Sequence, residues 1–181
     1  QFSSISNAVT PQGIMAVVRI PDDIYSDSLP DNTGTRVLLL EDIQDPGNTG
    51  TLIRTAAAFG YSGVILTEKC ADPLSPKCVQ ATAGAVLAVW LRRTARYLEL
   101  IKVLKKQGYT LEAADLNGEE DPSNLRTSSK LLLALGSEAS GLSPAVLKTS
   151  DHRFRIPIAR EKAESLNVAA SGAICMYLSV S

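Results

Sequence analysis

The sequence has few of the residues that metal and redox chemistry use. It contains a single histidine, His152, and three cysteines, Cys70, Cys78 and Cys175, which form no C-x-x-C pair. A mechanism that needs two histidines is therefore excluded, and neither a zinc site nor a disulfide framework is favoured. We expect the cysteines to be small buried hydrophobes in a reducing compartment. His152 follows Asp151 on a strand-like run, which favours a structural or surface role over catalysis.

Long apolar runs and an excess of charge of one sign are also absent from the sequence. No run approaches the ~20 residues that span a bilayer, and no charged-then-apolar leader opens the chain. We therefore expect a soluble protein of the cytoplasm or of an organelle matrix. The formal net charge of −1 excludes a chain that holds nucleic acid by bulk charge alone. With 181 residues and 45% hydrophobic content, one domain is expected, burying roughly 70% of the surface of its unfolded chain.

Two local clusters of basic residues could still contact phosphates. They are Arg92, Arg93 and Arg96 before a predicted helix, and Arg153, Arg155, Arg160 and Lys162 near the last loop. Solvated surface charges explain the same pattern equally well.

Apolar runs typical of strands alternate with segments of helical composition. The predicted strands cover residues 14–20, 37–40, 63–67, 86–91, 109–113, 131–135 and 153–158. The predicted helices cover residues 52–59, 76–83, 94–107 and 166–180, and residues 116–129 form a turn-rich connection. This alternation predicts an α/β fold with a mostly parallel sheet flanked by helices. The last helix is apolar nearly all round, so we expect it in the core or in a subunit interface.

Three loops far apart in the chain each follow a strand-like run, and parallel sheets bind ligands at the carboxyl ends of their strands. The loops are residues 45–50, 136–141 and 157–167. In the first, Asn48 is expected to cap the next helix, and Gly50 lies one turn before Arg54, leaving space beside the guanidinium. This arrangement suits an anionic or oxygen-rich ligand, although an ordinary cap with a solvated arginine explains the loop equally well.

The second loop has a glycine at each end, Gly136 and Gly141, after an apolar strand. Its spacing imitates a P-loop, but Leu142 stands where the phosphate-binding lysine is required, so a nucleoside triphosphatase is disfavoured. The glycines instead permit tight turns that offer backbone amides and carbonyls to a ligand. Glu138 is the only carboxylate of the loop, and a solvated surface acid is the alternative interpretation of it.

The third loop leads into the last helix. Ser165 is expected to be the N-cap of that helix, and Asn167 to lie in its first turn. Capping chemistry alone would explain both residues. A dinucleotide-binding enzyme is the obvious alternative for an alternating sheet, but no G-x-G-x-x-G follows any predicted strand.

Taken together, the three loops resemble a known family. The motifs are Asn48-x-Gly50-x3-Arg54, Leu135-Gly136-Ser137-Glu138-x2-Gly141-Leu142, and Ile156-Pro157-Ile158 leading to Ser165-Leu166-Asn167-Val168. In this order they resemble the SpoU-type RNA ribose 2′-O-methyltransferases of the SPOUT superfamily, over about residues 36–181. Residues 82–85 resemble a family segment before a strand, and residues 10–14 resemble a link to a preceding RNA-binding domain.

The resemblance implies a fold, an assembly and a cofactor. The implied SPOUT fold has a deep trefoil knot near the C-terminus, forms a homodimer and binds S-adenosyl-L-methionine (AdoMet) in the knotted loops, without metal or membrane. Residues 1–13 would be the linker from a missing N-terminal RNA-binding domain, and residues 14–181 the methyltransferase catalytic domain.

The functional positions of the family carry over residue by residue. The implied catalytic residues are Asn48, Arg54, Glu138, Ser165 and Asn167. The implied cofactor-binding residues are Leu135, Gly136, Ser137, Gly141, Ile156, Pro157, Ile158, Ser165, Leu166 and Asn167. Two positions depart from the family pattern, because Arg160 stands where glycine is usual and Ala169 where serine is common. A bulky side chain in the cofactor loop could alter affinity or product release.

The expected reaction is methyl transfer from AdoMet to a ribose 2′-hydroxyl of structured RNA, with ribosomal RNA preferred to transfer RNA. The family account casts Arg54 as general base, whereas a guanidinium is protonated at physiological pH, so we expect it to stabilise the developing alkoxide. Asn167 and Ser165 would orient the arginine, the ribose or the cofactor, and Glu138 would hold its loop or meet Arg54 across the dimer. The alternative is a non-catalytic RNA-binding or ribosome-assembly protein that retains the fold.

Overall fold

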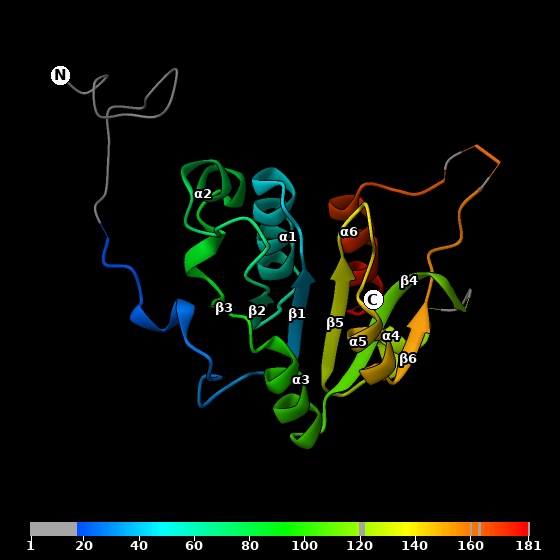
Figure 1. Cartoon of the computed structure of the whole chain (residues 1–181), viewed down its shortest axis with the longest axis horizontal. Coiled ribbons are helices and arrows are strands. Elements are labelled where there is room, and N and C mark those ends of the chain that lie inside the picture. Colours follow the sequence, from blue (N-terminus) through cyan, green and yellow to red (C-terminus); the bar gives the residue numbers. More distant parts are fainter. Residues whose placement is uncertain (1–17, 120–121, 160, 163, 181) are drawn as a thin grey trace.

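The computed structural model describes residues 18–119, 122–159, 161–162 and 164–180. Within them the chain forms one six-stranded sheet with the order β3-β2-β1-β5-β4-β6, in which all neighbouring strands are parallel (Figure 1). The strands are β1 (Arg36–Glu41), β2 (Gly63–Leu66), β3 (Trp90–Arg93), β4 (Thr110–Glu119), β5 (Leu131–Gly136) and β6 (His152–Phe154). The predicted parallel α/β sheet is therefore confirmed.

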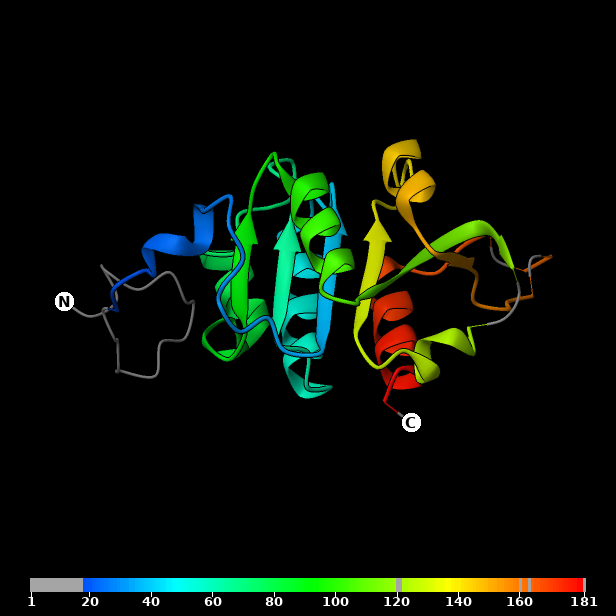
Figure 2. The same cartoon turned by 90° about the horizontal axis from the view of Figure 1, so that it is seen from below.

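Helices cover both faces of the sheet. They are α1 (Pro46–Ala58), α2 (Pro76–Thr82), α3 (Tyr97–Lys106), α4 (Asn124–Thr127), α5 (Pro144–Thr149) and α6 (Val168–Leu178), with 3-10 turns η2 (Asp22–Tyr25) and η3 (Ala85–Leu87). Figure 2 shows α1, α4 and α6 on one face and α3 and α5 on the other. The sheet is thus the middle of three layers, which is the usual setting of an all-parallel sheet.

The apolar runs of the central strands fill a core on each side of the sheet. Leu38 and Leu40 of β1 belong to the core beneath α1 and α6, whereas Val37 and Leu39 belong to the core beneath α3. All four side chains are fully buried. A strand buried on both faces requires such an unbroken run, which explains why the strands predicted at residues 37–40, 63–67, 109–113 and 131–135 are confirmed.

The strand predicted over residues 86–91 is wrong in its first half. Ala85–Leu87 form the turn η3, and only Trp90–Arg93 join the sheet, beside β2. The cause lies just upstream, where Ala83 and Gly84 have φ values of 49° and 90° and end α2 with a left-handed reversal. The chain therefore has to turn through η3 before it can enter the sheet.

Strands β4 and β6, neighbours at one edge of the sheet, differ in length from their predictions. β6 ends at Phe154 instead of continuing to Ile158, and β4 extends past its predicted end at residue 113 to Glu119, into the expected turn-rich connection. Ala114 and Glu119 of β4 both pair with Phe154, so the residues of β4 between them bulge out of the pairing with β6. Strand β6 ends at Phe154, and Arg155, Ile156 and Ile158 after it line a pocket.

Two helices, α4 and α5, are missing from the prediction, and one predicted strand cannot be compared. Helix α5 has ordinary start signals, since Ser143 accepts the N–H of Val146 and Pro144 is its first residue. The strand predicted over residues 14–20 lies mostly outside the described residues, and residues 18–20 are not part of a strand. The linker over residues 1–13 and Arg160 also lie outside the described residues.

Helix α6 is apolar on its buried side and on its exposed side. Gly172 and Met176 are buried, and a Cβ built on Gly172 would lie 2.3 Å from Leu52 of α1. On the other side, Ile174 and Tyr177 are 37% and 56% exposed. The helix predicted to lie in the core or in a subunit interface is therefore in the core on one side, and its other side is exposed to solvent in this chain.

The cysteines and the histidine have the structural environments that the sequence predicts. All three cysteines are buried and unpaired. The Nδ1 of His152 lies 2.7 Å from Oε1 of Glu112, a carboxylate buried in β4, so His152 joins β6 to β4. Burial raises the pKa of Glu112, and the hydrogen bond to His152 opposes that shift.

The segment before β1 is fastened along the edge strand β3. Arg92 of β3 is only 3% exposed, its Nη2 lies 2.7 Å from Oδ2 of Asp23, and its Nε donates to the carbonyl oxygen of Ser28. Ile24 of η2 is buried in the core on the α1 side. Arg92 is thus a buried structural residue that holds the η2 segment against β3. It is neither the phosphate contact nor the solvated charge that the sequence suggested.

Gly50 lies where α1 packs on α2. A Cβ built on Gly50 would lie 2.5 Å from the carbonyl oxygen of Cys78 and 2.6 Å from the Cβ of Ala81. The expectation that Gly50 leaves space beside Arg54 is therefore wrong, because α2 occupies that space. The glycine serves helix packing instead.

Gly50→Ala should destabilise the protein although alanine is the better helix former. The added methyl group meets the backbone of α2, and such overpacking costs about 1–3 kcal/mol, with this site at the upper end because a backbone carbonyl cannot rotate away. The gain in helix propensity is only about 1 kcal/mol. Thr51→Ala, at the exposed neighbouring position, is the control and should leave the free energy of unfolding unchanged or slightly higher. Chemical denaturation measures both, and a Gly50→Ala protein as stable as wild type would contradict this packing.

Candidate active site

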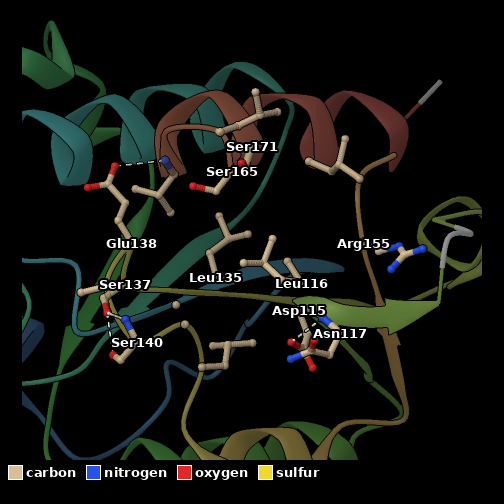
Figure 3. A pocket seen from close by; sticks show the side chains of 18 of the residues that line it. Asp115, Leu116, Asn117, Leu135, Ser137, Glu138, Ser140, Arg155, Ser165 and Ser171 are labelled. Carbon is tan, nitrogen blue, oxygen red and sulfur yellow. Dashed lines mark hydrogen bonds between the residues drawn. The ribbon is translucent and has the colours of Figure 1, made fainter. Parts of the chain in front are cut away.

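A pocket of about 300 Å³ opens at the carboxyl ends of β5, β4 and β6, beside the start of α6 (Figure 3). These strands are neighbours in the sheet, so loops distant in sequence meet there, as expected for a parallel sheet. Leu116 and Leu135 contribute apolar surface to the lining. In Figure 3, Glu138 lies at one end of the pocket, next to α6, and Asp115 and Asn117 lie at the opposite end.

The loop after β5 is shaped by its two glycines. A Cβ on Gly136 would lie 2.1 Å from the carbonyl carbon of Gly141, so a side chain there would force the loop open. Gly141 has a φ of 65°, in the left-handed region that glycine adopts without strain. The N–H of Gly141 donates to the carbonyl oxygen of Ser137 at 2.8 Å, and the N–H of Ser140 donates to Oγ of Ser137 at 3.2 Å. The loop is therefore a closed turn with a defined shape.

Glu138 joins the three loops that the sequence singled out. Its Oε1 accepts hydrogen bonds from Nδ2 of Asn48 at 3.1 Å, from Nδ2 of Asn167 at 2.9 Å, and from the N–H of Val168 at 3.2 Å. Nδ2 of Asn167 also donates to Oδ1 of Asn48 at 3.1 Å, across 119 positions of sequence. Glu138 is therefore exposed to solvent, as a surface acid would be, but its side chain is also held in a polar cluster with Asn48 and Asn167.

Both capping assignments from the sequence are wrong. Asp45, not Asn48, caps α1, because Pro46 begins the helix and Oδ1 of Asp45 accepts the N–H of Asn48 at 2.7 Å. This hydrogen bond holds the pKa of Asp45 below its ordinary value. Asn167, not Ser165, caps α6, since its Oδ1 accepts N–H groups of the first turn. The side chain of Asn167 thus uses Oδ1 for the helix and Nδ2 for the cluster with Glu138.

The far end of the pocket comes from β4, where sequence analysis expected a turn-rich connection. Nε and Nη2 of Arg153 donate to Oδ2 of Asp115 at 3.0 and 2.6 Å, and Oδ1 of Asp115 accepts the N–H of Asn117 at 3.0 Å. Leu116, between them, is 55% exposed and lines the pocket. An apolar wall with a few fixed polar groups is typical of a small-molecule site. The rule that found the other loops, polar residues directly after an apolar strand, also applies to Asp115.

The pocket gathers most of the residues predicted to bind a cofactor. Those that line it are Leu135, Gly136, Ser137, Gly141, Ile156, Ile158, Ser165 and Leu166, together with Glu138. Pro157 is outside the lining, and Asn48 and Asn167 reach it only through their hydrogen bonds to Glu138. Arg54 is exposed on α1 and is also outside the lining. A single subunit therefore does not bring Arg54 into the pocket.

The basic residues of the two sequence clusters are mostly engaged within the subunit. Nη2 of Arg93 donates to two backbone carbonyl oxygens, and Arg153 holds Asp115. Arg155 lines the pocket. The side chain of Arg96 is 62% exposed. With Arg92 buried, the first cluster offers Arg96 as its solvent-facing charge.

The described part of the chain has neither a metal cluster nor a membrane-spanning helix. No group of three or more His, Cys, Asp or Glu side chains is arranged there to hold a metal ion. None of the described helices is both long enough and apolar enough to cross a bilayer.

Comparison with known proteins gives consistent matches. Residues 35–177 match the model of the SpoU rRNA Methylase family. An uncharacterised tRNA/rRNA methyltransferase of Synechocystis is 34% identical over 97% of this chain and 63% of its own length. The 23S rRNA (guanosine(2553)-2′-O)-methyltransferase RlmP of Bacillus subtilis is 33% identical over 97% of this chain and 68% of its own.

Solved structures of the same kind share the fold. A proposed RNA methyltransferase of the TrmH family from Porphyromonas gingivalis superposes with a TM-score of 0.84 and 34% identity, covering 99% of this chain and 70% of that chain. An AdoMet-bound rRNA methyltransferase from Sinorhizobium meliloti superposes with a TM-score of 0.75 and 34% identity, covering 86% and 60%.

The parallel sheet with a pocket at its carboxyl edge defines an α/β domain of the kind seen in these solved methyltransferase structures. The chain belongs to the SpoU rRNA Methylase family, and the resemblance seen in the three motifs is confirmed. It spans 63% of the length of the Synechocystis relative.

Glu138→Ala should loosen the junction of the three loops. The change removes the acceptor of three hydrogen bonds. Because the cluster is exposed to solvent, the expected loss in free energy of unfolding is only about 1 kcal/mol. Hydrogen exchange should rise at the start of α6, which mass spectrometry of its peptides measures. Glu164→Ala, an exposed carboxylate of the neighbouring loop, is the control, and equal exchange in both variants would contradict the role of Glu138.

Proposed function

We propose that this domain transfers a methyl group from AdoMet to a ribose 2′-hydroxyl of RNA. The observation that carries the proposal is the convergence of Asn48, Glu138 and Asn167 beside a pocket, in a chain of the SpoU rRNA Methylase family. RlmP, named as a 2′-O-methyltransferase of 23S rRNA, supports the reaction, and the AdoMet-bound structure from Sinorhizobium meliloti supports the cofactor.

The residues of the pocket fit a nucleoside cofactor. Leu116 and Leu135 offer apolar surface for a planar base, while Asp115 and Asn117 offer polar groups suited to hydroxyls or amines. The volume of about 300 Å³ is at the small end of the range for ligand pockets. We therefore propose that the lining residues hold AdoMet. AdoMet carries an activated methyl group on a sulfonium, so the transfer needs no metal.

We further propose that a second subunit completes the site. Arg54 lies outside the pocket of its own subunit, and α1, which carries it, packs beside α6. A homodimer formed through α1 and α6 would cover the exposed side chains of Ile174 and Tyr177. By two-fold symmetry it would also bring Arg54 of each subunit toward the pocket of the other.

In this dimer, Arg54 would act on the ribose oxygen. A guanidinium is protonated at neutral pH, so its proposed role is to stabilise the developing alkoxide while a phosphate or water accepts the proton. The cluster of Asn48, Glu138 and Asn167 would hold the loops that align the oxygen with the methyl group for in-line displacement. Ser165, at the start of α6, would orient the ribose or the methionine end of the cofactor.

The finer features of the family belong to the same proposal. Ribosomal RNA is the proposed substrate class, with transfer RNA second, and residues 1–13 are proposed to link the domain to a preceding RNA-binding domain. The loops after β5 and β6 would form the C-terminal trefoil knot. Such an enzyme would work in the cytoplasm or an organelle matrix, where its RNA is found.

Arg54→Lys should retain the charge and lose the planar fork of the guanidinium. Turnover on RNA should then fall by about 100-fold, while affinity for S-adenosylhomocysteine stays within about twofold. A tritiated-methyl assay on ribosomal and transfer RNA measures turnover, and calorimetry measures affinity. A wild-type pH–rate profile with an ionisation near neutrality that Arg54→Lys abolishes would contradict the electrostatic role. Cofactor binding without transfer to any RNA would favour the non-catalytic RNA-binding alternative.

Subunit mixing tests which subunit supplies Arg54. An Arg54→Ala protein and a Leu116→Arg protein, whose pocket is blocked, should each be inactive. After subunit exchange they should regain about one quarter of wild-type turnover, because half of the dimers are mixed and each has one intact site. Failure to recover would mean that Arg54 does not act across the dimer.

Tyr177→Glu should convert the proposed dimer into monomers. A carboxylate placed inside an apolar interface without a partner costs several kcal/mol. Light scattering coupled to size exclusion measures the mass. Leu87→Glu is the matched control, since Leu87 is an exposed apolar side chain on η3, 68% accessible. A Tyr177→Glu protein that stays dimeric would exclude the α6 surface as the interface.

A further inference from the structure

Glu41, the last residue of β1, is a buried carboxylate surrounded by hydrogen-bond donors. The residue is 3% exposed. Its Oε2 accepts the N–H of Ser143 at 2.7 Å, and its Oε1 accepts the hydroxyl groups of Ser143 at 2.7 Å and of Tyr97 at 2.8 Å. Among the residues that the structure describes, no Lys or Arg forms an ion pair with it.

Glu41 lies beneath the far end of the loop that forms one wall of the pocket. In the register of β1 and β5 it stands opposite Gly136, where that loop begins. The loop ends at Leu142, which is 6% exposed and packs in the core beneath α3, and Ser143 then caps α5. Gly136 therefore fixes one end of the loop, and Glu41 fixes the other through Ser143.

The contacts around Glu41 suit a carboxylate. Burial of a charge without a cationic partner is costly, so a neutral side chain would be the cheaper occupant. The two carboxylate oxygens, however, accept the N–H and hydroxyl of Ser143 and the hydroxyl of Tyr97 at once, whereas an amide could hold all three groups only if both hydroxyls turned round to accept. Burial and the hydrogen bond to Glu41 raise the pKa of Tyr97 to about 12, which keeps its hydroxyl a donor at neutral pH.

We propose that Glu41 is a positioning residue for cofactor binding. It fixes Ser143 and, through it, the loop of residues 137–142, without touching the cofactor, because Glu41 does not line the pocket. The inference rests on the proposed function of this pocket. Glu41 adds to the site a residue from β1 itself. The motifs had drawn attention only to the loop that follows β1, which carries Asn48.

Glu41→Gln tests the inference. The amide has the same shape but only one acceptor oxygen, so either the N–H of Ser143 loses its acceptor or both hydroxyls must turn round to accept from the NH2 group, and the hold on Ser143 is weakened. Affinity for S-adenosylhomocysteine, measured by calorimetry, should fall about tenfold, the effect of losing one hydrogen bond to a charged group. Hydrogen exchange in peptides that cover residues 137–143 should rise.

Tyr97→Phe is the matched control. It removes one donor from the same carboxylate on the side of α3 and leaves both hydrogen bonds to Ser143 in place. It should lower the melting temperature while cofactor affinity and exchange of the loop remain as in wild type. This separates positioning of the loop from general loss of stability.

The outcomes distinguish the inference from the function on which it rests. Equal cofactor affinity in the Glu41→Gln and Tyr97→Phe proteins, or unchanged loop exchange in Glu41→Gln, would overturn the role of Glu41. Should Glu41→Gln not fold, Ser143→Ala removes one hydroxyl contact and should weaken binding about threefold against Tyr97→Phe. A wild-type protein that does not bind S-adenosylhomocysteine would refute the proposed function instead, and the exchange measurement would still decide the role of Glu41.

Discussion

The site depends on one carboxylate oxygen. Oε1 of Glu138 accepts hydrogen bonds from the first turn of α1, from the cap of α6 and from the first N–H of α6. Glu138 follows β5, α1 follows β1 and α6 is the last helix, and the parallel strand order brings these three segments to one edge of the sheet. The contacts are individually weak because they are exposed, so their value lies in fixing the relative position of Asn48 and Asn167.

The fold was predictable where burial alone decides the structure. The runs that became β1 and β5 are apolar at every interior position, which a strand covered on both faces requires. The misassigned segments follow backbone geometry instead. Ala83 and Gly84 reverse the chain through left-handed conformations, and β4 shifts its register against the end of β6, where Ala114 and Glu119 both pair with Phe154. Neither a reversal at alanine nor a register shift changes the hydrophobic pattern, so neither is visible in the sequence.

The site was predictable in its members and less so in their roles. Motif spacing identified Asn48, Glu138 and Asn167, which prove to be hydrogen-bonded to one another. It could not assign the caps, because capping depends on which of several suitable residues has the extended backbone before the helix. Asp115 was missed although it follows an apolar run, and its partner Arg153, 38 positions away on another strand, gave no local signal in the sequence. Gly50 was misinterpreted because its neighbour, α2, is defined only by the tertiary packing.

The η2 segment, held on the edge strand β3 by Arg92, also affects how molecules can associate. An unprotected edge strand is a template for pairing with other chains. On β3 that edge is covered by the η2 segment, through Arg92 with Asp23 and Ser28, and at the opposite border β6 is only three residues long. Among the described residues neither border offers a long free ladder, which protects the sheet against edge-to-edge aggregation and would direct any association to the helical surfaces.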